Sequence, residues 1–169
     1  LYSNFSYIDL TMNINNGQLF VLKKHNLTSE QQKLFQREKD NYLSISHPLI
    51  LRYFGTIKDK EQICLILEFI NGETLNDIDL SQFDEKTKLN FIFSIMIVIQ
   101  YLHFNGFIYR DLKPNNLMID QNNSIVLIDL DRMVKNSEEN TGANSTHSFA
   151  HDYSAPEICI YDNVTITEK

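Results

Sequence analysis

The sequence predicts an α+β fold in two unequal parts, a small strand-rich part with one helix followed by a mainly helical part. Two observations support this division. Residues 5–69 contain short apolar runs separated by turn residues, with a single helical stretch among them. Residues 83–104, in contrast, form one long segment that is almost wholly apolar. A chain of 169 residues with 43% hydrophobic content is long enough to bury one core.

The first part is expected to hold four strands and one helix. The expected strands are residues 5–12, 19–23, 51–58 and 62–69. Asn16-Gly17 between the first two strands is typical of a hairpin turn. The helix is predicted over residues 29–44, with Thr28 and Ser29 as candidate N-caps.

The second part begins with a helix predicted over residues 83–104. Because this segment is apolar on all sides, we expect it to be buried on most sides. A strand-like run follows at residues 125–128, and the polar residues 135–148 are typical of a mobile loop.

The segment from Tyr109 to Asn116 carries the strongest chemical signal. It contains Asp111, Lys113 and Asn116, and Asp129 follows thirteen residues later at the end of the strand-like run. An aspartate can accept the proton of a hydroxyl, and amide and carboxylate oxygens bind Mg²⁺ beside nucleotide phosphates. An ordinary turn would explain the same residues, but the five fixed residues arise by chance with a probability on the order of 10⁻⁴. The pattern therefore favours phosphoryl transfer.

Glu38 is a charged residue in the apolar stripe of the predicted helix. The stripe also contains Leu34, Phe35, Tyr42 and Ile45. A buried carboxylate is costly unless it is paired, and Lys23 in an apolar strand poses the same problem with the opposite charge. We expect an ion pair between Lys23 and Glu38; the alternative is that both lie at exposed edges.

These motifs together resemble the eukaryotic protein kinases, in one colinear order over nearly the whole chain. The family's catalytic-loop signature is matched by residues 109–116, with tyrosine in place of histidine. Its Asp-Phe-Gly is similar to Asp129-Leu130-Asp131, and its Ala-Pro-Glu is present as Ala155-Pro156-Glu157. The Lys-Pro in the catalytic loop resembles the serine/threonine branch.

The resemblance implies a bilobal, protein-kinase-like α+β fold with an N-lobe at residues 1–70 and a truncated C-lobe at residues 71–169. It also implies an enzyme that transfers the γ-phosphoryl group of ATP, with Mg²⁺, to a serine or threonine hydroxyl of a protein substrate. Because the chain begins with leucine and stops soon after Ala-Pro-Glu, we expect it to be a fragment.

The resemblance also assigns roles to individual residues. Asp111 would act as the base and Lys113 would steady the phosphoryl group, while Asn116 and Asp129 would bind magnesium. The residues expected at ATP are Ile8, Lys23, Glu38, Glu68, Ile70, Asn116 and Asp129.

A regulatory role is implied for Arg110, which would pair with a phosphate on Thr146 or Ser148 and so order the loop. The alternative is that hydroxyl residues are simply common in polar loops.

Several departures from the family pattern favour an alternative, a pseudokinase that acts as a protein-binding or scaffold module. The glycine positions of the phosphate-covering loop align with Leu1, Ser3 and Ser6, whose side chains would hold the backbone away from the phosphates. Val21 replaces a small residue over adenine, and Asp131 adds negative charge beside the metal site.

Composition excludes some partners. A net charge of −7 and a pI near 5.1 argue against nucleic acid and anionic membranes as partners. The longest apolar run, residues 91–99, is too short to span a bilayer, so we expect no membrane segment. Cys64 and Cys159 are expected to be reduced core residues in an intracellular, cytoplasmic protein.

Overall fold

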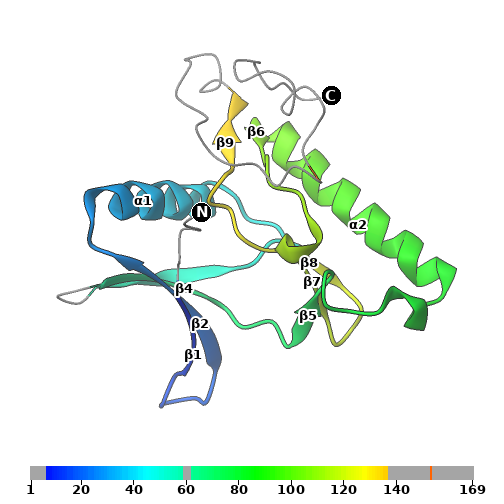
Figure 1. Ribbon diagram of the computed structural model, residues 1–169, viewed down its shortest axis with the longest axis horizontal. Coiled ribbons are helices and arrows are strands. Elements are labelled where there is room, and N and C mark those ends of the chain that lie inside the picture. Colours follow the sequence, from blue (N-terminus) through cyan, green and yellow to red (C-terminus); the bar gives the residue numbers. More distant parts are fainter. Residues whose placement is uncertain (1–6, 59–61, 137–152, 154–169) are drawn as a thin grey trace.

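The computed structural model describes residues 7–58, 62–136 and Tyr153 (Figure 1). The described chain begins with an antiparallel four-stranded sheet in the order β1-β2-β4-β3. Its strands are β1 (Tyr7–Met12), β2 (Leu19–Asn26), β3 (Tyr53–Lys58) and β4 (Gln62–Glu68). The predicted β1–β2 hairpin is present, and its turn contains Gly17 at φ +73°, a conformation that glycine adopts without strain.

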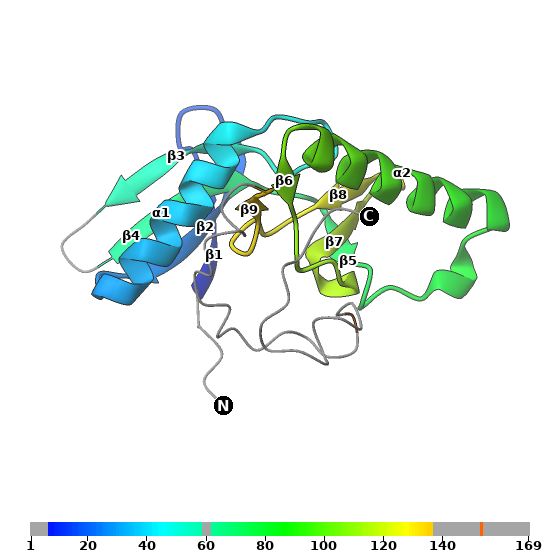
Figure 2. The same ribbon diagram turned by 90° about the horizontal axis from the view of Figure 1, so that it is seen from above.

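Helix α1 (Ser29–Ser44) lies across one face of this sheet (Figures 1 and 2). It begins as predicted, because the Thr28 hydroxyl accepts a hydrogen bond from the Gln31 N–H at 3.3 Å and so caps the first turn. Phe35 and Tyr42 on its inner face are buried in the core.

The second part contains a three-stranded antiparallel sheet in the order β5-β7-β8 and the long helix α2 (Glu85–Phe104). The three strands are β5 (Gly72–Thr74), β7 (Leu117–Asp120) and β8 (Ile125–Leu127). A Cβ atom on Gly72 would collide with the Ile119 backbone, so β5 can approach β7 only because this residue is glycine. Short 3₁₀ turns at Leu80–Gln82 and Pro114–Asn116 complete this part.

A short antiparallel pair, β6 (Phe107–Ile108) and β9 (Val134–Lys135), lies between α1 and α2 (Figure 2). The two parts are joined by a parallel bridge between Ile50 and Leu127, where the Leu51 N–H donates to the Leu127 carbonyl at 2.9 Å. One apolar cluster runs through both parts. The α+β class is therefore confirmed, while a domain boundary at residue 70 stays a prediction.

Two expectations for the second part are wrong. Helix α2 is not buried on most sides, because only Phe91, Val98 and Leu102 are buried and much of its apolar surface is exposed. Val134 and Lys135, at the start of the expected polar loop, form strand β9 against β6 because their backbone groups find partners there. Residues 137–148 of that loop lie outside the described residues.

Helix α2 is also the one described helix that is long and apolar enough to cross a membrane by length and composition. The nine-residue apolar run considered in the sequence understated it, because flanking apolar residues extend the segment. Such a helix is weak evidence for a span, since core helices have the same composition. Three side chains of α2 are in fact buried in the core of this domain.

Candidate active site

The Lys23 ammonium joins the two parts of the molecule. Its Nζ donates to Glu38 Oε1 at 2.8 Å and to Asp129 Oδ1 at 2.8 Å. The expected Lys23–Glu38 ion pair is therefore present, and Asp129 is a second carboxylate partner. Glu38 is completely buried, at 0% exposure, and Lys23 is buried as well. The unusual charges in the apolar stripe of α1 and in β2 thus satisfy each other.

Local structure explains this meeting of three distant segments. Lys23 lies on β2, a central strand of the sheet, while Glu38 lies on the inner face of α1. Asp129 follows β8 and has φ +62°, an uncommon conformation for a residue with a side chain. The surrounding packing thus holds the Asp129 carboxylate against Lys23, at a strain on the order of 1 kcal/mol.

The electrostatics of the cluster follow from burial and charge. Burial lowers the pKa of Lys23, but Glu38 and Asp129 outweigh it and raise that pKa above its usual value. Burial raises the pKa of Glu38 to about 7, although Lys23 opposes the shift. Burial also raises the pKa of Asp129, but attraction to Lys23 dominates and lowers it below the ordinary value. The lysine and Asp129 are therefore charged at neutral pH, whereas Glu38 is close to titration.

The catalytic-loop residues form a second cluster around the Asp111 carboxylate. Asp111 Oδ2 accepts hydrogen bonds from Lys113 Nζ at 2.8 Å and from Asn116 Nδ2 at 2.9 Å. The Asn116 amide also donates to the Asp111 carbonyl at 2.9 Å, and Arg132 Nε lies 4.0 Å from Oδ2. Because these donors all approach one oxygen or the backbone, Oδ1 of Asp111 is the oxygen that can accept a hydroxyl proton.

Tyr109, which replaces the histidine of the family pattern, takes a structural role. Its hydroxyl donates to the carbonyl oxygens of Ile128 at 2.8 Å and of Asp129 at 2.9 Å. Leu130, which replaces the family's phenylalanine, is completely buried. Both replacements keep bulky side chains in the core, and Tyr109 ties the catalytic loop to the Asp129 segment.

Asp131, which replaces a glycine of the family pattern, fits without a left-handed backbone conformation, since it is absent from the described residues with positive φ. Its N–H donates to Asp129 Oδ1 at 3.3 Å. Burial and the neighbouring Asp129 charge raise the pKa of Asp131, while Lys23 and Arg132 oppose this rise. The added negative charge therefore lies among cations.

The remaining residues expected at ATP lie around the sheet. Ile8 is exposed on β1 opposite Lys23. Glu68 ends β4, where its N–H donates to the Arg52 carbonyl at 2.8 Å and its Oε2 accepts from the Arg52 N–H at 3.3 Å. Ile70 follows β4 and packs against the core. Nucleotide contacts for these three residues stay a prediction.

Three further residues at the site went unnoticed in the sequence. Asn41 of α1 donates to the carbonyl oxygens of Leu130 at 2.7 Å and Met133 at 2.9 Å, so it ties the helix to the Asp129 segment. Arg132 approaches Asp111, and His25 approaches Glu38. The available signal was spacing: Asn41 lies one helical turn after Glu38, and His25 lies two residues after Lys23 on the same face of β2.

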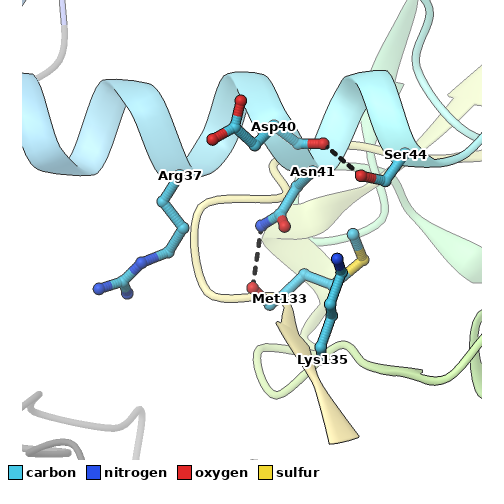
Figure 3. Close-up of a pocket in the computed structure, with 6 residues that line it drawn as sticks. All are labelled: Arg37, Asp40, Asn41, Ser44, Met133 and Lys135. Atoms are coloured by element: carbon cyan, nitrogen blue, oxygen red, sulfur yellow. Dashed lines mark hydrogen bonds between the residues drawn. The ribbon is translucent and has the colours of Figure 1, made fainter. Parts of the chain in front are cut away.

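A cavity of about 310 Å³ lies between α1 and the β9 segment (Figure 3). Figure 3 shows the Asn41 amide pointing at the Met133 carbonyl inside it. The residues that line it are Arg37, Asp40, Asn41, Ser44, Met133 and Lys135. Arg110, expected to be regulatory, has φ +70°. Its expected partners Thr146 and Ser148 lie outside the described residues.

The residues present fit a magnesium ion bound together with a nucleotide. The hydrogen bonds from Lys23 and from the Asp131 N–H both reach Asp129 Oδ1, which leaves Oδ2 for a cation. Asn116 uses its amide nitrogen toward Asp111, which leaves its amide oxygen. Magnesium commonly takes one or two protein ligands and completes its shell with phosphates and water. Accordingly, no cluster of three or more metal-binding side chains is found among the described residues.

Comparisons with known proteins agree with this geometry. The sequence profile of the protein kinase domain matches residues 4–169, so the chain belongs to the protein kinase family. It is 30% identical over 132 residues to cAMP-dependent protein kinase type 3 of Saccharomyces cerevisiae, which covers 75% of this chain and 33% of that protein. It is 31% identical over 140 residues to an Aurora kinase of Debaryomyces hansenii, covering 82% of this chain and 34% of that protein.

A third relative, mitogen-activated protein kinase kinase kinase 3 of Arabidopsis thaliana, is 26% identical over 169 residues, 92% of this chain and 26% of that protein. These relatives are serine/threonine kinases, and the chain spans about a third of their length or less. The expected kinase family and serine/threonine type are confirmed at this level.

Proposed function

We propose that this chain is the ATP-binding and catalytic part of an active protein serine/threonine kinase that transfers the γ-phosphoryl group of Mg-ATP to a protein hydroxyl. The observation that carries the proposal is the position of Lys23, whose ammonium is hydrogen-bonded at 2.8 Å to both Glu38 and Asp129. A lysine held in this way projects its charge toward the place where the phosphates of a nucleotide would lie.

The chain's own residues have distinct tasks in this reaction. Asp111 orients the substrate hydroxyl and accepts its proton through Oδ1. Lys113, 2.8 Å from Asp111 Oδ2, balances the charge of the base and can turn to the phosphoryl group as negative charge develops on it. Lys23 attracts the nucleotide phosphates, and Glu38 keeps Lys23 in place.

Asn116 and Asp129 are the residues that would hold magnesium. When bound, the ion would neutralise the phosphate oxygens and fix their orientation. Lys23 keeps the pKa of Asp129 below its ordinary value, so this ligand is ionised at neutral pH.

The pseudokinase alternative gains no support from the comparisons, since the relatives named above carry kinase names. The non-glycine residues at positions 1, 3 and 6 lie outside the described residues. We therefore propose catalysis, in an intracellular protein whose substrate is another protein.

A phosphotransfer assay on the full-length protein tests the proposal, with radiolabelled ATP, Mg²⁺ and a generic protein acceptor such as casein. We expect Asp111→Asn and Asp129→Asn each to lower the rate by at least about 100-fold. Asp79→Asn is the matched control, because Asp79 caps a distant 3₁₀ turn and asparagine is an equally good cap. A rate that is equal in wild type and Asp129→Asn would reject catalysis.

We also propose that phosphorylation of Thr146 or Ser148 activates the enzyme through Arg110. Arg110 follows β6, whose partner strand carries Lys135 of the cavity in Figure 3. Arg37 and Lys135 therefore place two further cations near this end of β6. Mass spectrometry of protein purified from its own cell tests the proposal, and a fully active form without phosphate at either residue would contradict it.

A further inference from the structure

His25 is a buried histidine that the proposed mechanism leaves without a task. It lies on β2 two residues after Lys23, so both side chains point to the face of the sheet that α1 covers. Only 5% of its surface is exposed. Its ring packs edge-on against Phe35 of α1, with the ring centroids 5.5 Å apart. The packing of strand and helix thus fixes this imidazole beside the Lys23–Glu38 pair.

The Glu38 carboxylate faces two different cationic or polar groups with its two oxygens. Oε1 accepts the hydrogen bond from Lys23, whereas Oε2 lies 3.6 Å from Nε2 of His25. Oε2 and both ring nitrogens of His25 are buried, and within the described part of the chain they have no hydrogen-bond partner. Buried polar atoms are seldom left in this state, because each costs about 1–3 kcal/mol. A movement of about 0.6 Å would bring Nε2 and Oε2 to ordinary hydrogen-bond distance.

The charges around His25 decide which form of the ring occupies this place. Lys23 faces it from β2, Glu38 from α1, and Asp129 and Asp131 act on the cluster from the segment after β8. Its neighbour across the sheet, Ile63 of β4, is uncharged, and the Gln31 side chain approaches without forming a hydrogen bond. Burial and Lys23 lower the pKa of His25 to about 4, so the ring is neutral at pH 7.

A neutral imidazole carries one N–H, and the geometry selects the nitrogen that bears it. Nε2 is the ring atom that faces Glu38 Oε2. A proton on Nε2 gives that oxygen a donor, whereas a proton on Nδ1 would set a lone pair against a carboxylate. The Nε2–H form is therefore the stable tautomer here.

We propose that His25 is a positioning residue for Glu38: its neutral ring donates the Nε2–H to Oε2 and thereby keeps the carboxylate charged and aligned with Lys23. Both oxygens of Glu38 are then held, one from each of two residues on the same strand. The effect on catalysis rests on the proposed function, whereas the hydrogen bond itself does not.

The chemical consequence follows from the position of Glu38 in the interior. A donor to a buried carboxylate favours the charged form and lowers its pKa. Without His25, the pKa of Glu38 would rise above its value of about 7 and the side chain would be protonated at neutral pH. A protonated Glu38 attracts Lys23 weakly, and the ammonium would then remain on Asp129, the residue proposed to bind magnesium.

Nuclear magnetic resonance tests the hydrogen bond without relying on catalysis. The full-length protein is labelled with ¹⁵N-histidine, and the His25 signals are assigned by their loss in His25→Gln. We expect the nitrogen shifts of a neutral Nε2–H ring at pH 7. The Nδ1–H tautomer, or a doubly protonated ring at pH 7, would overturn the proposal.

Enzyme kinetics test the positioning role with a pair of matched variants. His25→Leu keeps an apolar side chain without a donor, whereas His25→Gln restores an N–H donor. For His25→Leu we expect kcat/KM for ATP to fall about tenfold at pH 6.5 and to recover toward pH 8.5, where Glu38 ionises unaided. His25→Gln should stay within about twofold of wild type. His103→Leu on α2, far from the cluster, is the control for a general effect of losing a histidine.

Identical pH profiles for wild type and His25→Leu would contradict the positioning role. If the wild type has no phosphotransfer activity, the proposed function fails separately. The pH dependence of binding of a fluorescent ATP analogue, measured on the same two variants, then decides the role of His25, with the same shift expected for His25→Leu alone.

Discussion

The two long helices bury the opposite of what their compositions suggest. Helix α1 is rich in charged residues, yet it buries Glu38 completely and Asn41 almost completely. Helix α2 is mostly apolar, yet it buries only three side chains. Its exposed apolar residues are Leu89, Ile92, Phe93, Met96, Ile97 and Phe104.

The difference shows that the elements packed against a helix decide burial, and composition alone does not. Helix α1 lies on a sheet that offers Lys23, and the segment after β8 offers the Leu130 and Met133 carbonyls to Asn41. Polar groups can be buried there because each finds a partner. Helix α2 meets the described strands along one narrow stripe, so the rest of its apolar surface faces outward. An apolar surface of this kind is typical of a face that contacts another element or protein.

The largest expected effect distinguishes the two faces of α2. Leu102 is 0% exposed and Leu89 is 52% exposed, so the same substitution can be compared on one helix. We expect Leu102→Ala to lower the free energy of unfolding by about 3 kcal/mol, because it leaves a cavity. Leu89→Ala should cost less than about 1 kcal/mol. Urea denaturation of both variants measures the difference, and equal losses would show that Leu89 is covered in the full-length protein.

The next effect concerns the buried charge of α1. Glu38→Gln keeps the shape of the side chain but removes the charge that holds Lys23. We expect kcat/KM for ATP to fall about 30-fold, or about 2 kcal/mol. Steady-state kinetics at pH 8 measure the loss, and Gln36→Glu on the exposed side of α1 is the control. A loss below about twofold would mean that Asp129 alone positions Lys23.

The pH dependence of stability separates the two titrating groups at the α1–β2 interface. The folded-state pKa of Glu38, about 7, lies above its ordinary 4.5, so its contribution to the free energy of unfolding falls as pH rises between these values. The folded-state pKa of His25, about 4, lies below its ordinary 6.5, so its contribution rises with pH between these values. Between pH 4.5 and 6.5 the two contributions therefore oppose each other.

Denaturation from pH 4 to 8 can resolve the two contributions by difference. Wild type minus His25→Gln should rise with pH, and wild type minus Glu38→Gln should fall. Two differences of the same sign of slope would show that one of these pKa values is shifted in the other direction.

The smallest effect is expected for an ion pair on the surface of α2. Lys88 Nζ lies 2.9 Å from Glu85 Oε1, nearly the same distance as in the buried Lys23–Glu38 pair. Because Glu85 is exposed, water and salt screen the pair, and Lys88→Gln should change the free energy of unfolding by less than about 0.5 kcal/mol. Thermal unfolding at low and high salt measures it. A larger loss would imply that Lys88 has a further partner.

Local signals allowed much of this protein to be predicted. Turn and cap residues such as Gly17 and Thr28 act within a few positions, so the hairpin and the start of α1 were predicted correctly. The apolar stripe around Glu38 and the lone lysine in β2 predicted their pairing, since two buried opposite charges need each other. The strands β5, β6 and β9 are only two or three residues long, too short for a periodic pattern to reveal.

The sequence by itself determined the family, the order of the motifs and the identity of the charged residues, because these depend on residue type and spacing along the chain. Only the tertiary structure decided that Lys23 contacts Asp129 from 106 residues away, and that His25 and Asn41 join the site. It also left most of α2 exposed. These outcomes depend on which surfaces meet after folding, and a pattern within one segment contains no information about the segment packed against it.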